Sequence, residues 1–460
     1  MSMLESRITF YKNVKNKLND IGPGMCLAKW SQLTLHLQNG HNHSCHHPNT
    51  HLVPLEEIAI DPSALHNTKF KKAARKEMMT GLRPEECHYC WNVEDSVPEG
   101  RDDIFSDRIL KTGEQWSLAL KNEVETLGFS GNINPSYLEV SFSHGCNFKC
   151  SYCSPHISSK WMEEIKQYGG YPTSRNYNDI IHIEENKKMP IPEREDNPYV
   201  DAFWAWWPNL YPSLHTFRIT GGEPLMSKHT FRVLDYIIEN PNPKMELAIN
   251  SNCVVEDKLF DRFIEKIKKI EELNAVRLVT LYTSCEAHGA KAEYIRNGLD
   301  YNKWIENCSK ILSSIPTLYF SIMSTYNALS VTSYTEFLAD VLALKKEFDN
   351  DHRRIGIDIP YLNHPQWMNV GILTSEYKPL ITKQLEFMRS NKITDTNLSG
   401  FKEHEISKLE RIQYLFQNTP NPVHQKDFVL FFDEHDRRRN TDFLATFPEM
   451  SNFYNYCKGL

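Results

Sequence analysis

Short apolar runs alternate with longer segments of helical periodicity through the central part of the chain. The runs have the length of buried strands, and this alternation is typical of repeated strand–helix units that build a parallel sheet. In barrels of such units the chemistry gathers at the C-terminal ends of the strands, so site residues are expected there. The strands predicted in this way are Tyr137–Ser143, Thr216–Thr220, Glu246–Asn250, Val276–Tyr282, Leu318–Met323 and Ile355–Ile359.

A different pattern near the N-terminus predicts a β-hairpin. Leucines alternate with polar residues over Leu33–Leu37, as expected of a half-buried strand, and Asn39-Gly40 follows. An Asn-Gly pair between two strands is the strongest short signal for a hairpin turn. The return strand would carry Cys45 back beside Cys26.

A basic helix is predicted next, over residues 67–81, and Gly81 provides its stop signal. It precedes Cys87 and Cys90, a C-x2-C pair that completes four candidate thiolates with Cys26 and Cys45. Zinc and an iron–sulfur cluster both fit such a set, and nearby imidazoles suit zinc. The histidines around Cys45, which by themselves also suit a solvated loop, are His41, His43, His46, His47 and His51.

A denser group of cysteines follows the first strand of the predicted sheet. Cys146, Cys150 and Cys153 lie within eight residues, directly after Gly145, where a loop at the end of a strand is expected. Thiolates bind zinc or iron–sulfur clusters, and one loop can supply three of them while a fourth coordination position stays open. The triplet alone leaves open an iron–sulfur site, a zinc loop and a chance cluster of reduced cysteines.

The second strand of the predicted sheet is followed by Gly221-Gly222-Glu223-Pro224. Glycine lets the backbone approach a ligand closely and adopt conformations closed to other residues, and the proline stiffens the exit. This turn is therefore a candidate ligand-binding element.

The spacing C-x3-C-x2-C with Tyr152 before the third cysteine, followed about seventy residues later by Gly-Gly-Glu-Pro, resembles the signature of the radical S-adenosylmethionine (radical SAM) superfamily. The resemblance implies an α/β fold with a partial (β/α)6 barrel, which the six predicted strands fit. It also implies that the three cysteines bind a [4Fe–4S] cluster whose open iron is chelated by SAM. Tyr152 would lie against the adenine, and Glu223 with its turn would contact the amino group of SAM.

The resemblance assigns further residues after the third and fourth strands. Ser251 and Asn252 align with an element that touches the SAM ribose, although ordinary turn chemistry would also explain them. Ser284 and Arg296 align with a segment that binds the SAM carboxylate and ribose, and Arg296 could instead form a surface ion pair. The cysteines that follow these strands, Cys253 and Cys285, are candidate hydrogen-atom donors, with buried inert thiols as the alternative.

The N-terminal cysteines resemble the twitch or SPASM-type modules of many radical SAM enzymes. There a cysteine, a hairpin with a glycine turn and later cysteines bind a second Fe–S cluster. The resemblance implies that Cys26, Cys45, Cys87 and Cys90 hold such an auxiliary cluster here. The module precedes the barrel, whereas better-known members carry it at the C-terminus, and this leaves zinc open as the occupant.

The 460 residues allow several domains. We predict an N-terminal auxiliary-cluster module with a linker over residues 1–130, the barrel over 131–395 and a small helical extension over 396–460. The insertion 158–198 shows little periodicity and, beside an active site, could form part of a substrate lid. The triplet Arg437–Arg439 lies among acidic residues, which predicts a solvated face.

Composition limits the partners and the compartment. A net charge of −7 gives no general argument for nucleic acid or an anionic membrane. The first seventeen residues lack the apolar core of a signal peptide, and no apolar run is long enough to span a bilayer. The eleven cysteines, some of them in C-x2-C spacings, favour metal ligation in a reducing compartment. We therefore expect a cytoplasmic protein.

By the resemblance, the expected function is reductive cleavage of SAM to a 5′-deoxyadenosyl radical, which removes hydrogen from a substrate. A peptide or protein side chain is the leading substrate class by analogy, a small molecule fits as well, and flavodoxin or ferredoxin would donate the electron. One alternative is a nucleoside or RNA substrate, for which the basic helix near residues 69–76 is the hint. Another is a zinc-stabilised binding protein without catalysis.

Overall fold

The computed structural model describes residues 3–98, 101, 103–175, 178–349, 353–417 and 419–460. The chain forms two compact units. Unit 1 comprises Met1–Phe142, Pro190–Thr220 and Asn242–Leu247, and unit 2 comprises Ser143–Met189, Gly221–Pro241 and Ala248–Leu460. These units divide the chain differently from the proposed boundaries at residues 130 and 395, which stay a prediction.

The strands of unit 1 follow the order β7-β6-β4-β1-β2-β3. β1 runs parallel to β4, and β4 runs parallel to β6. β1 pairs with β2 antiparallel, with Thr34 opposite His43 and a turn at Gly40 (φ +72°), so the predicted hairpin is confirmed. The strands are β1 (Gln32–His36), β2 (His41–His43), β3 (His51–Leu52), β4 (Tyr137–Ser141), β6 (Thr216–Thr220) and β7 (Asn242–Ser251), whose last four residues belong to unit 2.

Several helices of unit 1 contribute to a core that includes Leu18, Trp30 and Met78. The predicted basic helix is confirmed as α4, which begins after the Thr68 cap. Residues 115–127 form two short helices, α7 and α8. The helices are α1 (Met3–Ile21), α2 (Ala28–Ser31), α3 (Leu55–Ile60), α4 (Lys69–Met79), α5 (His88–Asp95), α6 (Asp107–Gly113), α7 (Gln115–Leu118), α8 (Lys121–Leu127) and α11 (Pro198–Leu210).

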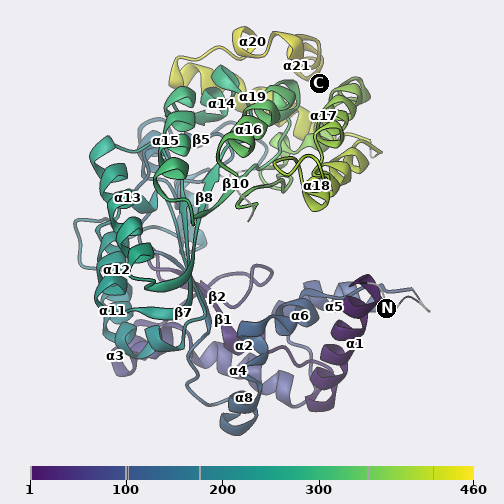
Figure 1. The fold of residues 1–460 in the computed structure, drawn as a ribbon. Coiled ribbons are helices and arrows are strands. Elements are labelled where there is room, and N and C mark those ends of the chain that lie inside the picture. The colour runs from purple at the N-terminus through teal and green to yellow at the C-terminus, as the bar shows by residue number, and fades with distance from the viewer. Residues whose placement is uncertain (1–2, 99–100, 102, 176–177, 350–352, 418) are drawn as a thin grey trace. The chain divides into compact units, whose positions relative to one another are not determined.

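The strands of unit 2 follow the order β11-β10-β8-β7, and β10 runs parallel to both β8 and β11 (Figure 1). A separate small sheet pairs β5 with β9. All six predicted sheet strands are present, as β4, β6, β7, β8, β10 and β11, so the expected α/β class with a largely parallel sheet is confirmed. The strands not yet given are β5 (Lys149–Cys150), β8 (Val276–Ser284), β9 (Arg296–Asn297), β10 (Tyr319–Met323) and β11 (Ile355–Asp358).

The helices of unit 2 follow its strands along the chain, and their apolar faces are buried. Two helices, α9 and α10, lie in the insertion 158–198, which is therefore more regular than its weak periodicity predicts; Ser158 caps α9. These helices are α9 (Ser159–Tyr168), α10 (Ile180–Glu185), α12 (Lys228–Glu239), α13 (Asp257–Glu272), α14 (Gly289–Ile295), α15 (Tyr301–Ser314), α16 (Tyr334–Phe348), α17 (Lys378–Ser390), α18 (Glu403–Tyr414), α19 (Pro422–Arg439), α20 (Phe443–Thr446) and α21 (Ser451–Lys458).

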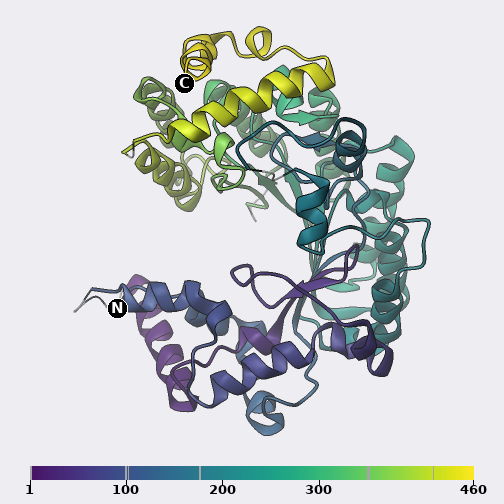
Figure 2. The same ribbon diagram turned by 180° about the vertical axis from the view of Figure 1, so that it is seen from behind.

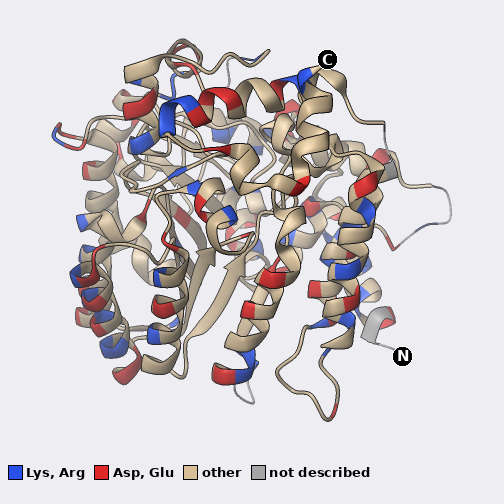
Figure 3. Ribbon diagram, turned by 90° about the horizontal axis from the view of Figure 1, so that it is seen from above, with Lys and Arg blue, Asp and Glu red and all other residues tan. Residues whose placement is uncertain are grey.

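Charged residues of both signs are interspersed along the helices (Figure 3). The ion pair between Lys345 on α16 and Glu405 on α18 is fully buried, with the two groups 3.1 Å apart and both side chains inaccessible to solvent. Among the described residues, no helix combines the length and the apolar character that crossing a membrane requires.

Candidate functional site

The three clustered cysteines lie on one loop of unit 2, residues 146–153, which we call the cluster loop. Its backbone turns tightly, because Cys153 N donates to Cys150 O at 2.9 Å and Phe148 N donates to the sulfur of Cys146 at 3.5 Å. Burial raises the pKa of Cys153 to about 12 and raises the pKa of Cys150 as well. The three thiols are close enough to influence one another's pKa values. As soft donors on one loop they fit a [4Fe–4S] cluster, whose binding would displace their protons.

The Gly221–Pro224 turn packs directly against the residues that precede the cluster loop. Gly222 N donates to Ser143 O at 3.2 Å, and Glu223 N donates to Gly145 O at 2.7 Å. A Cβ atom on Gly222 would lie 2.3 Å from Gly145 O, and Gly221 has φ +124°. Gly222 is therefore required because the Gly145 backbone approaches it closely, and Gly221 because its backbone conformation favours glycine.

The Glu223 carboxylate is buried and holds the end of β7 in place. It accepts hydrogen bonds from Ser251 Oγ (2.8 Å), Asn252 N (2.7 Å) and Leu225 N (3.0 Å). Burial raises the pKa of Glu223 to about 7, against the lowering effect of these donors. Asn252 Nδ2 donates in turn to Asn147 Oδ1 in the cluster loop at 2.8 Å. The turn, the end of β7 and the cluster loop therefore form one hydrogen-bonded assembly.

Arg296 lies beside the cluster loop because β9 pairs with β5, which sets Arg296 opposite Cys150. Its Nη1 lies 3.8 Å from the sulfur of Cys150. Its Nε and Nη2 donate to Glu286 Oε2 at 2.9 and 2.7 Å, and both side chains are buried. Arg296 thus forms a buried ion pair, so the surface ion pair considered as its alternative role is wrong, while its contact with SAM stays a prediction.

Tyr152 and Glu286 complete this group. The Tyr152 hydroxyl donates to Glu286 Oε2 at 3.2 Å and accepts a hydrogen bond from Arg296 Nη2. The second oxygen of Glu286, Oε1, is buried without a hydrogen-bond partner. Sequence reasoning missed Glu286, although an acidic residue two positions after the end of β8 was a usable signal.

The remaining candidate residues lie at or just after the ends of β7 and β8. Ser284 is the last residue of β8. Cys253 follows β7 with φ +59° and lies near Cys308 of α15, and Cys285 follows β8. Cys253 and Cys285 are inaccessible to solvent, and burial raises the pKa of Cys285 to about 12. Their role as hydrogen donors stays a prediction.

The cluster loop is also held by α19, the long yellow helix in Figure 2. Arg439 Nη1 donates to Lys149 O at 2.7 Å, and Arg439 Nε donates to Glu164 Oε2 at 3.0 Å. The pKa of Glu164 is lowered to about 2, because Arg439 and Lys149 outweigh its burial. Arg438 donates to Gly169 O at 2.9 Å. The arginines were predicted to form a solvated face; this is wrong for Arg438 and Arg439, since both side chains are buried.

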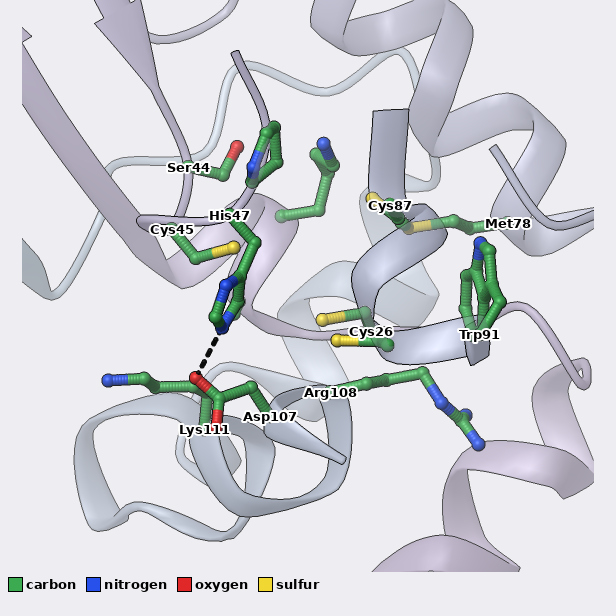
Figure 4. Close-up of a pocket in the computed structure, with 14 residues that line it drawn as sticks. Cys26, Ser44, Cys45, His47, Met78, Cys87, Trp91, Asp107, Arg108 and Lys111 are labelled. Carbon is green, nitrogen blue, oxygen red and sulfur yellow. Dashed lines mark hydrogen bonds and ion pairs between the residues drawn. The ribbon is translucent and has the colours of Figure 1, made fainter. Parts of the chain in front are cut away.

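The four N-terminal cysteines meet in one pocket of unit 1 (Figure 4). Cys26 precedes α2, Cys45 follows β2, and Cys87 and Cys90 lie at the start of α5. The pocket encloses about 440 Å3 of space between atoms, including its opening. Burial, reinforced by Cys45 and Cys87, raises the pKa of Cys90 to about 12. Four convergent thiols of this kind fit a metal centre ligated by four cysteines.

One histidine lines this pocket. His47 Nε2 lies 2.8 Å from Asp107 Oδ2, and its ring stacks on Tyr89. His41 and His43 are buried in β2, which corrects the reading of these histidines as a solvated loop. Among the described residues, no group of three His, Cys, Asp or Glu side chains stands ready to hold a single metal ion.

Comparison with known proteins bears on the cluster loop and its surroundings. The model of the radical SAM superfamily matches residues 140–327. The crystal structure of Streptococcus suis SuiB bound to S-adenosylmethionine is similar, with 13% sequence identity and a TM-score of 0.34. The match covers 78% of this chain and 69% of that chain. No curated protein matches.

The segment 140–327 contains the cluster loop, the Gly221–Pro224 turn, the end of β7 and the Arg296–Glu286 pair. The family implies a [4Fe–4S] cluster and SAM as cofactors, which the donor set of the cluster loop fits. Residues 140–327 therefore match the radical SAM superfamily and form the radical SAM domain of this chain.

Proposed function

We propose that this enzyme cleaves SAM reductively and uses the resulting radical to remove hydrogen from a peptide or protein side chain. When bound, the [4Fe–4S] cluster and SAM supply the electron transfer and the 5′-deoxyadenosyl radical. The observation that carries the proposal is the assembly of the cluster loop with the Gly221–Pro224 turn, which shares hydrogen bonds with both Gly145 and Asn252.

In this proposal the residues of the chain bind and orient the cofactors. Cys146, Cys150 and Cys153 ligate the cluster. Glu223 presents a buried carboxylate whose raised pKa shows that burial disfavours its charge, and a cationic amino group of SAM would offset that cost. Arg296, fixed by Glu286, places a permanent cation beside Cys150 and suits the SAM carboxylate.

The four N-terminal cysteines hold a second Fe–S cluster in this proposal, as in twitch or SPASM-type modules. Their convergence in one pocket supports it. A flavodoxin or ferredoxin would supply the electron for the SAM-binding cluster.

The peptide substrate rests on analogy. The competing RNA substrate has less support, since Lys71 and Arg75 of the basic helix are buried, although Lys69 and Lys76 are exposed. Salt-sensitive RNA binding would support that alternative.

Anaerobic reconstitution tests the proposal. Wild type, a Cys146/Cys150/Cys153→Ala variant and a Cys26/Cys45/Cys87/Cys90→Ala variant are compared for iron, sulfide and dithionite-driven release of 5′-deoxyadenosine. We expect about eight irons in wild type and about four in each variant, with nucleoside released whenever the cluster loop is intact. Zinc without iron, or full iron loading without SAM cleavage, would contradict the proposal.

A further inference from the structure

Three cationic side chains are buried together beside the four-cysteine pocket. Lys29 of α2 is 3% exposed, Lys71 of α4 is 1% exposed and Arg75 of α4 is fully buried. Cations are seldom buried unless an anion or a metal centre compensates them. Their burial therefore requires an explanation in the charges that surround them.

Hydrogen bonds join the three basic residues through neutral groups. Lys71 Nζ donates to His66 Nδ1 at 2.8 Å, and Arg75 donates to Asn67 Oδ1 at 2.8 Å and to Lys29 O at 3.3 Å. Burial lowers the pKa of His66 well below its ordinary value, which disfavours a charged ring. Among the residues that the structure describes, this network gives neither Lys71 nor Arg75 a carboxylate partner.

Lys29 connects the network to the pocket. Its ammonium lies 2.6 Å from Glu86 Oε1, and Lys29 lines the pocket together with Cys87. Arg108 also lines the pocket; it is buried, lowers the pKa of Cys26 and pairs with Glu94 at 2.8 Å.

The basic side chains around the pocket outnumber the carboxylates that pair with them. Lys29 pairs with Glu86 and Arg108 pairs with Glu94, and Asp107 also lines the pocket, whereas Lys71 and Arg75 hydrogen-bond neutral groups. Burial and the neighbouring Arg75 and Lys29 push the pKa of Lys71 well below its ordinary value, while Glu86 and Cys45 oppose the shift. A cluster with four thiolate ligands is an anion, so it would supply the missing negative charge.

We propose that Lys29, Lys71 and Arg75 form a buried cationic wall that stabilises negative charge on the centre held by Cys26, Cys45, Cys87 and Cys90 and so raises its reduction potential. The inference rests on the proposed second cluster. Reduction adds one electron to the cluster from an external reductant, and the wall stabilises the more negative product in a medium of low dielectric constant. These three side chains are positioning and tuning residues, since none of them ligates metal in this proposal.

The test uses the full chain with the Cys146/Cys150/Cys153→Ala background, so that one cluster is titrated. The midpoint potential is measured by anaerobic redox titration with electron paramagnetic resonance for Lys71→Met and Lys29→Met. Lys76→Met is the matched control, because Lys76 is exposed on the same helix. We expect each wall variant to lower the ratio of reduced to oxidised cluster about tenfold at fixed potential, a shift of about 59 mV to more negative values, and the control to match the background.

The charge-conserving variants Lys71→Arg and Lys29→Arg decide the outcome if a Met variant loads no iron. Iron in the Arg variant but not in the Met variant supports the cationic wall. Unchanged midpoint potentials in both iron-loaded Met variants overturn the proposal. Loss of iron in all four variants also overturns it, because the shape of the side chains rather than their charge is then essential. Absence of iron from the background protein itself would instead refute the proposed second cluster.

Discussion

Replacing Glu223 with Gln should change how the stability of the metal-free protein depends on pH. The carboxyl is buried, and its pKa is about 7, against 4.5 for an exposed glutamate. The folded state therefore holds the proton more tightly than the unfolded state. The stability that this provides is fully present below about pH 4.5 and is lost as the pH rises through about 7.

The expected size follows from the two pKa values. Between about pH 5 and about pH 8, wild type should lose about 2.5 kcal/mol of unfolding free energy through Glu223. Glutamine carries no titrating proton, so the Glu223→Gln variant should lack this loss. At low pH the variant should be the less stable protein by about 1 to 3 kcal/mol, because its amide places a donor against the donors of Ser251 and Asn252.

Urea denaturation of both proteins at several pH values between about 5 and 8 measures this difference, and distant titrating groups cancel in the comparison. Glu265→Gln, at an exposed position on α13, is the control and should run parallel to wild type. Parallel curves for wild type and Glu223→Gln, or a wild type that gains stability relative to the variant as the pH rises, would refute the account of Glu223 as a carboxyl whose burial favours the proton.

Three further predictions concern the support of the cluster loop and the core. Gly222→Ala should abolish iron loading at the cluster loop, because its Cβ would meet Gly145 O at 2.3 Å, whereas Gly356→Ala, with its nearest contact at 3.6 Å, should load normally; equal iron contents would contradict this. Arg439→Met should lower the free energy of unfolding by about 3–5 kcal/mol, since it leaves Glu164 buried beside one remaining cation. Arg437→Met, at an exposed position, should leave the denaturation curve unchanged. Similar curves for the two variants would refute the role of Arg439 in holding the cluster loop. Lys345→Met should also cost about 3–5 kcal/mol by stranding Glu405, and an unaltered denaturation midpoint would contradict a stabilising role for this pair.

The sheet strands and the cluster motifs could be predicted because their determinants are local. β6, β8 and β10 appear as apolar runs of strand length, and the hairpin is specified by Asn39-Gly40. The cysteine spacing and the double glycine are likewise readable within a few residues. Each of these features depends on the chain within one element and its turn.

The remaining features depend on contacts between distant segments. The parallel pairing of β1 with β4 joins segments about a hundred residues apart, and no local pattern specifies it. Lys71 and Arg75 follow the composition of an exposed basic helix, and only the fold brings His66 and Lys29 against them. Glu286 looks like any acidic loop residue until β9 sets Arg296 beside it.

The bond between Arg439 and the Lys149 carbonyl spans 290 positions of the chain. At ordinary translation rates, a ribosome takes about 15 to 60 s to synthesise that interval. A nascent chain therefore exposes its three cysteines well before α19 exists to fix them. Iron and sulfide that bind during translation would therefore bind a cluster loop not yet held by α19. Iron and sulfide that bind after release from the ribosome would bind a loop already held by Arg439.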